Sequence, residues 1–236
     1  MRFATTQWSL VVAAGQRGSA EAEAALERLC SQYWYPVFVF VRRQGHSLDQ
    51  AEDLTQSFFT RLIEKEVLHE ADQSRGRFRS FLLVSCQRFL SNERDRTLAA
   101  KRGGGKTPLS IDASAAEARY QHALAHEETP ERLYERQWCV TLLERVLDDL
   151  REEYVTEGRQ QLFERLRGFL TIDGDSGSQA EAARDLGMTI AAVKVAVHRL
   201  RRRYREALRE HVAATVASPD EVEDERRYLL NTLRNL

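Results

Sequence analysis

Two stretches of the chain concentrate positive charge, and their chemistry suits contact with nucleic acid. Residues 189–211 hold seven cations and two anions, a net charge of +5 in a chain whose total is −1. Residues 72–106 hold nine cations and three anions, a net charge of +6, with phenylalanines interleaved. Cations neutralise phosphates, and aromatic rings beside cations suit the unstacked bases of single-stranded DNA. The distribution of charge, rather than its total, therefore points to a nucleic-acid partner.

Each stretch also has a plainer interpretation. A run of arginines alone is typical of a solvated helix face. In residues 72–106, Phe81, Leu82 and Phe89 could equally belong to a hydrophobic core. Charge and aromatic content by themselves leave both alternatives open.

The local sequence around residues 189–211 favours DNA binding. Ser178 with Glu181 three positions later forms the pattern of a capping box. Gly187 suits a left-handed turn, and Thr189 suits the cap of a following helix. Two helices joined in this way predict a helix-turn-helix whose second helix enters the major groove. The outward positions early in that helix are Ala191, Ala192, Lys194, Val195 and His198.

An acidic, amphipathic helix is predicted at residues 49–62. Its apolar face consists of Ala51, Leu54, Phe58 and Leu62, and its polar face of Asp49, Asp53, Gln56 and Thr60, with Glu52 beside them. Acids in the first turn, after a Ser47 cap, complement the helix dipole without any further function. A catalytic carboxylate pair is a poorer interpretation, because no partnered histidine and no metal-ligand spacing accompany the acids.

The elements that carry these stretches are helical almost throughout. Apolar periodicity predicts helices at residues 21–43, 47–66, 76–96, 131–152 and 156–172, followed by two short helices. We therefore expect an all-α protein of two helical domains joined by a flexible linker, with the helix-turn-helix in the C-terminal domain. The predicted parts are a domain at 1–98, a linker at 99–129, a domain at 130–212 and an acidic, amphipathic tail at 213–236.

Composition excludes several other classes. Cys30, Cys86 and Cys139 are far apart and match neither a zinc pattern nor a disulfide framework, which suits a reducing cytoplasm. No signal peptide opens the chain, and no apolar run approaches the roughly 18–20 residues that span a bilayer. We therefore expect a cytoplasmic protein without membrane insertion, cofactor or metal. The six histidines show no grouping that would suggest a small helical enzyme.

Taken in this order, the motifs resemble the bacterial sigma-70 family, most closely its extracytoplasmic-function group, which keeps only two sigma domains. Residues 49–62 resemble the core-polymerase-binding helix, which typically reads D-A-E-D-L-x-Q-x-x-F. Residues 76–96 resemble the segment that melts and reads the minus-ten promoter element. Residues 178–205 resemble the domain that binds the minus-thirty-five element. Residues 5–8, 33–36 and 92–96 further resemble a subgroup common in environmental bacteria with large genomes.

The resemblance implies a sigma factor that directs promoter-specific initiation and has no catalysis of its own. Core RNA polymerase would contact Asp49, Glu52, Asp53 and Gln56. A flipped base of the minus-ten element would lie against Arg75, Arg77, Phe78, Gln87 and Arg88. The minus-thirty-five element would contact Ala191, Ala192, Lys194, Val195, His198 and Arg199, with its phosphates on Arg201, Arg202 and Arg203. Promoter DNA and core polymerase are the implied partners, and an anti-sigma factor or other regulator is compatible with the resemblance.

Two points stay open at the level of sequence. The alternative function is a DNA-binding regulator that does not join polymerase, although it gives no reason for the order of the two N-terminal motifs. The tail at 218–236 either restrains DNA binding by packing on the basic helix or on a partner, or completes a domain core. A phosphorylation switch at Thr55 is not expected, because Asp49, Glu52 and Asp53 already supply negative charge.

Overall fold

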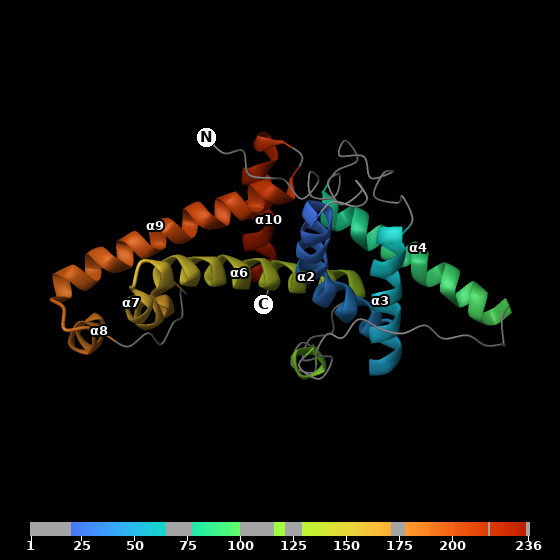
Figure 1. Cartoon of the computed structure of the whole chain (residues 1–236), viewed down its shortest axis with the longest axis horizontal. Helices are drawn as coiled ribbons and strands as arrows, with labels where there is room; N and C mark the ends of the chain where they lie inside the picture. Colours follow the sequence, from blue (N-terminus) through green and yellow to red (C-terminus); the bar gives the residue numbers. More distant parts are fainter. Residues whose placement is uncertain are drawn as a thin grey trace. The chain divides into compact units, whose positions relative to one another are not determined.

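The computed structural model describes residues 20–64, 77–99, 116–120, 129–170, 178–216 and 218–234 (Figure 1). Every regular element in these residues is a helix, which confirms the predicted all-α class. The chain divides into two compact units. The first unit comprises residues 1–141 and 213–236, and the second unit comprises residues 142–212. None of the described helices is both long and apolar enough to cross a bilayer.

The first unit contains α2 (Ala20–Arg43), α3 (Leu48–Glu64) and α4 (Phe78–Ala99). The apolar run at residues 37–41 lies in α2 and is completely buried, so α2 is the centre of this unit. α3 packs against α2 (Figure 1). Between them Gly45 adopts φ +92°, a left-handed conformation that suits glycine. The predicted Ser47 cap is confirmed, because Ser47 Oγ accepts a hydrogen bond from the Gln50 amide at 3.3 Å.

The first unit also takes in segments that the sequence assigned elsewhere. α6 (Pro130–Thr156) begins one residue before the predicted start at 131, and its N-terminal half buries Leu133, Tyr134 and Trp138 in this unit. The tail forms η4 (Pro219–Glu221) and α10 (Val222–Arg234), which buries Val222 and Leu229. The break after residue 212 coincides with the predicted start of the tail, whereas the other break follows residue 141 instead of the predicted 129. Residues 130–141 and the tail belong to the first unit because their buried apolar side chains complete its core.

Most of the predicted linker lies outside the described residues, but residues 116–120 are helical. Glu117 accepts two hydrogen bonds from the Arg42 guanidinium of α2, at 2.9 and 2.7 Å. The Arg42 guanidinium also lies 4.8 Å from the centre of the Tyr120 ring, and Tyr120 is buried. This part of the predicted linker is therefore anchored to the first unit.

The second unit holds the C-terminal half of α6, then α7 (Gln160–Leu166), η3 (Arg167–Leu170), α8 (Gln179–Asp185) and most of α9 (Ile190–Thr215). Gly158, at φ +69°, follows the end of α6. The next helix therefore begins at Gln160, four residues later than the predicted start at 156. The core of this unit includes Leu150, Tyr154, Phe163 and Leu166.

The local signals around α8 and α9 are confirmed. Ser178 and Glu181 form the capping box at the start of α8. Gly187 takes φ +62° in the turn, and Thr189 Oγ1 accepts the Ala192 amide hydrogen at 3.2 Å at the start of α9. The turn at residues 186–189 therefore joins two well-capped helices.

The apolar spacing of Ile190, Val193, Val197 and Leu200 predicts an inward face of α9, and this prediction is confirmed in part. Val193, Val197 and Leu200 are buried, but Ile190 is 48% exposed. Side chains tilt toward the N-terminus of their helix, so the first residue of α9 projects beyond the buried stripe. The prediction that Ile190 faces inward is therefore wrong.

Candidate nucleic-acid and protein interfaces

The first turns of α9 present an exposed surface of mixed chemistry. Of the predicted DNA-reading residues on it, Ala192 is half-buried, and the exposed ones are Ala191, Lys194, Val195, His198 and Arg199. Neither Lys194 nor Arg199 forms an ion pair within the described part of the chain. Val195 is 51% exposed between these cations. A surface with free cations around an apolar side chain can neutralise phosphates and contact a thymine methyl group.

The three predicted phosphate-binding arginines of α9 differ from one another. Arg201 donates from Nε and Nη2 to the Phe169 carbonyl oxygen, at 3.0 and 2.9 Å. Arg202 pairs with Glu206 at 2.8 Å, and both side chains are exposed. These two guanidiniums stay at the surface, although each already has an intramolecular partner.

Arg203 has a different environment from its two neighbours. Its Nη2 lies 2.6 Å from Glu157 Oε1, and its guanidinium lies 5.0 Å from the centre of the Tyr154 ring. The hydrogen bond from Arg203 lowers the pKa of Glu157 below its ordinary value. The structure therefore places Arg203 in a contact between α9 and the end of α6 within the second unit.

The polar face of α3 is exposed in part. Asp49 and Asp53 are exposed, whereas Glu52 and Gln56 are half-buried. On the opposite face Ala51, Phe58 and Leu62 are buried as predicted. Leu54 is only half-buried, and Thr55, one position further along the helix, lies completely inside the unit.

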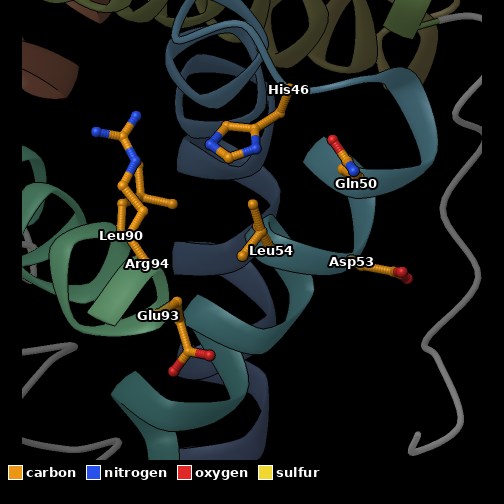
Figure 2. A pocket seen from close by; sticks show the side chains of 7 residues that line it. All are labelled: His46, Gln50, Asp53, Leu54, Leu90, Glu93 and Arg94. Carbon is orange, nitrogen blue, oxygen red and sulfur yellow. The ribbon is translucent and has the colours of Figure 1, made fainter. Parts of the chain in front are cut away.

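A pocket of about 610 Å³ lies beside this face, between α3 and α4 (Figure 2). It is lined by His46, Gln50, Asp53, Leu54, Leu90, Glu93 and Arg94. Figure 2 shows Leu54 and Leu90 inside the pocket and the Asp53 carboxylate turned outward. The pocket is therefore an apolar depression next to an exposed acid.

His46 gives this pocket a polar group. Its Nε2 atom is buried and has no hydrogen-bond partner within the described part of the chain. Burial and the charge of Arg94 lower the pKa of His46 below its ordinary value. A neutral imidazole here can donate to or accept from a side chain that enters the pocket.

The N-terminus of α4 holds two predicted DNA-binding residues in very different positions. Arg77 is about one-third exposed, and its Nε lies 2.7 Å from Glu225 Oε2 of α10. Phe78 is only 1% exposed, and its ring packs edge-on against Tyr33 at 5.2 Å. Because no face of the Phe78 ring is open to a base, its prediction as a DNA contact is corrected to a core role. Arg75 lies outside the described residues.

The outer face of α4 carries the other predicted residues. Gln87 is half-buried and donates to Glu131 at 3.1 Å, whereas Arg88 is exposed and has no ion pair among the residues described. One turn earlier, Val84 is 44% exposed. Sequence analysis did not single out Val84, although its position outside the buried stripe through Leu82, Cys86 and Phe89 is a usable signal.

Sequence analysis also missed a buried ionic cluster in the first unit. Glu225 is completely buried and accepts hydrogen bonds from Arg79 Nε at 2.9 Å and Nη2 at 3.3 Å. Arg79 is only 3% exposed and also pairs with Glu135 at 3.2 Å. Tyr228 donates to Glu135, and burial together with this hydrogen bond raises the pKa of Tyr228 to about 12. The one sequence signal is an acid at an apolar position of α10, between Val222 and Leu229.

The described residues offer little for covalent or metal chemistry. Cys86 and Cys139 are buried, and burial raises the pKa of each thiol to about 12, which disfavours the reactive thiolate. No group of three or more histidine, cysteine or acidic side chains suited to a metal ion occurs in the part of the chain that is described.

Comparison with known proteins returned no relative. No protein-family model matches the chain, and neither a curated protein nor a solved structure shows significant similarity to it.

Proposed function

We propose that this chain is a sigma factor of the extracytoplasmic-function group, which joins core RNA polymerase and directs it to promoters. The observation that carries the proposal is the order of three exposed surfaces along the chain. An acidic face on α3 is followed by a cationic face on α4 and then by a cationic, apolar-centred face at the start of α9. This order is that of polymerase binding, minus-ten reading and minus-thirty-five reading in the sigma-70 family.

Polymerase binding is assigned to α3. Asp49 and Asp53 present carboxylates to solvent, with Glu52 and Gln56 beside them. The neighbouring pocket offers apolar surface from Leu54 and Leu90. Charge complementarity guides association and register, while a buried apolar anchor supplies affinity. Acids around an apolar pocket therefore suit a basic helical partner.

Promoter DNA is assigned to two further surfaces. The start of α9 reads the minus-thirty-five element in double-stranded DNA through the exposed side chains named above, of which Lys194 and Arg199 carry the charge. α4 contacts the opened minus-ten element through Arg77 and Arg88, with Val84 as an exposed apolar neighbour. The subunit acts in the cytoplasm and leaves RNA synthesis to polymerase. An anti-sigma factor or other regulator stays a prediction.

Binding to core polymerase in the absence of DNA is the decisive test. We expect the full-length chain to bind bacterial core, and Asp53→Lys to weaken binding at least about tenfold, since charge reversal replaces attraction by repulsion. The matched control is Asp148→Lys, which makes the same change at an exposed acid of α6 in the second unit. Failure of the unaltered chain to bind core, with DNA binding intact, would instead support the regulator that does not join polymerase.

Run-off transcription from genomic fragments, with purified core and this chain, tests the complete function. We expect transcripts that begin at defined sites and that depend on the chain. The same assay supplies the promoter fragments for the experiments below. Transcription that is unaffected by the chain on every fragment would contradict the proposal.

A further inference from the structure

The tail helix α10 is attached to the start of α4 through one carboxylate. Glu225 lies completely inside the first unit, and three guanidinium nitrogens surround it. Arg79 Nε and Nη2 approach to 2.9 and 3.3 Å, and Arg77 Nε approaches to 2.7 Å. Glu225 therefore binds the two arginines that begin the proposed minus-ten-reading helix.

The burial of this cluster indicates that α10 stays in place. The Arg79 guanidinium lies 5.0 Å from the centre of the Trp138 ring and 4.2 Å from that of Tyr228. Its charge and that of Arg77 are balanced by Glu225 and Glu135. A buried charge that loses its partner is strongly destabilising. If α10 departed, Arg79 would keep only Glu135.

Apolar contacts of α10 support the same conclusion. Val222 and Leu229 are buried on the face that carries Glu225. Further along, Thr232 lies near the buried Cys139 thiol of α6. Undocking of α10 would expose these groups to water together with the ionic cluster. A helix held by these contacts is poorly suited to block the DNA-binding surface and to dissociate from it before DNA binds.

Arg77 is the member of the cluster that reaches the surface. Its Nε pairs with Glu225, and its guanidinium lies 5.6 Å from the centre of the Tyr228 ring. The two terminal nitrogens of Arg77 have no hydrogen-bond partner among the residues described. An arginine fixed at one edge loses less conformational freedom when its other nitrogens bind a ligand.

We propose that α10 is a permanent part of the minus-ten-reading surface, in which Glu225 is a positioning residue that holds Arg77 for the non-template strand. The inference rests on the proposed sigma function. It replaces both sequence-based alternatives for the tail, because α10 neither restrains DNA binding nor merely fills a core. DNA binding is instead expected to require α10 in its docked position.

A reversible covalent lock tests whether α10 stays docked. Thr232→Cys places a second thiol against the native Cys139, so that oxidation can join α10 to α6 by a disulfide. The oxidised holoenzyme should open a promoter fragment from the run-off assay within about twofold of its reduced rate. The unaltered chain under the same oxidant and the Thr232→Ser variant are the controls.

Two results of the lock experiment would overturn the proposal. Promoter opening that disappears on oxidation and returns on reduction would show that α10 must leave. Failure of the disulfide to form, while both thiols react with a soluble thiol reagent at the rate of exposed cysteines, would show that α10 does not lie against α6. In both cases core binding and initiation by the unaltered chain are measured first. If core binding and initiation by the unaltered chain are normal, only the inference about α10 is contradicted. If they are absent, the proposed function is contradicted as well.

The positioning role of Glu225 is tested in the locked chain, where the disulfide holds α10 without the carboxylate. Arg77→Gln and Glu225→Gln should each slow promoter opening about tenfold, and the double variant should be no slower than either. Glu223→Gln, at an exposed acid of the same helix, should have no effect. Core binding should not change in any variant.

If Arg77→Gln and Glu225→Gln slowed promoter opening multiplicatively in the double variant, Glu225 would act independently of Arg77, as a merely structural residue would. That result, or an unchanged opening rate for Glu225→Gln, would overturn the positioning role.

Discussion

The two basic segments of this protein look alike in sequence and differ in how the fold uses their charge. At the start of α4, Arg79 is almost completely buried and Arg77 is held by a buried carboxylate. At the start of α9, Lys194 and Arg199 are exposed. Segments with net charges of +6 and +5 therefore place the cations at their starts in opposite environments. A charge count identifies a basic segment but does not tell which of its cations a phosphate can reach.

The difference follows from what packs against each segment. α10 brings Glu225 to α4, and this acid lies 146 residues away from Arg79 in the chain. The early turns of α9 receive no such acid among the described residues, and only later does Arg203 meet Glu157. Buried ion pairs and exposed cations respond differently to substitution, which yields four predictions.

The largest effect is expected for Glu225→Ala. It leaves Arg79 buried without its main partner and should lower the free energy of unfolding of the first unit by about 3–5 kcal/mol. Glu223→Ala, which removes the exposed pair with Arg226 on the same helix, should cost at most about 1 kcal/mol. Denaturant unfolding followed by tryptophan fluorescence reports on this unit, because Trp34 and Trp138 are buried in it. Equal effects of the two substitutions on the free energy of unfolding would contradict the distinction between the buried and the exposed ion pair.

Two substitutions in α9, Arg199→Met and Arg203→Met, should distinguish a cation that binds DNA from a cation that stabilises the fold. Loss of the exposed Arg199 should weaken binding of the holoenzyme to double-stranded promoter DNA about tenfold and reduce the salt slope by about 1. Loss of Arg203 should leave the salt slope unchanged and slightly destabilise the second unit, since it removes the ion pair with Glu157. Salt titrations of binding, together with hydrogen exchange of α9 amides, measure both. A reduced slope for Arg203→Met would place it on a phosphate.

Arg88→Ala tests whether an exposed cation of the first segment behaves like those of α9. Because Arg88 has no described ion pair, the substitution should change stability by no more than about 0.5 kcal/mol. It should nevertheless weaken binding of the holoenzyme to a single-stranded minus-ten oligonucleotide, by about fivefold. Fluorescence anisotropy with the oligonucleotide, over a range of salt concentration, checks this. Unchanged affinity would remove Arg88 from the proposed surface.

The smallest effect is expected for the exposed pair of Arg202 and Glu206. Breaking it with Glu206→Gln should have almost no effect on stability, and salt should abolish any difference. DNA affinity should rise slightly, because Arg202 is released for phosphates. Thermal unfolding at low and high salt, with DNA binding in parallel, measures these changes. A large effect that persists at high salt would mean that exposed pairs on α9 resemble the buried cluster.

Much of the candidate surface could be predicted because its signals are local. The caps at Ser47, Ser178 and Thr189 and the turn at Gly187 are specified by neighbouring residues, and all four are confirmed. Periodicity also predicted the buried face of α3 in outline. It did not show that Thr55 is completely buried, with no hydrogen-bond partner for its Oγ1 among the described residues. A kinase therefore cannot reach Thr55 in this fold, a stronger argument against a phosphorylation switch than the neighbouring acids.

Predictions failed where packing, rather than local sequence, decides exposure. Phe78 belongs to a segment whose composition suits bases, yet its ring lies in the core beside Tyr33. Ile190 fits the periodicity of the buried stripe, yet it is exposed at the end of its helix. Neither outcome follows from residue type, since an aromatic or aliphatic side chain suits both a core and a binding surface.

The sequence by itself determined the helices, their caps, and the order of the acidic and basic faces, because each depends on residues within a few turns of one another. Tertiary structure alone decided where the tail docks, which cations are buried, and that residues 130–141 belong to the first unit. The physical reason is that burial depends on contacts between distant segments. Glu225 becomes a partner of Arg79 only when α10 and α4 share a core from which water is excluded.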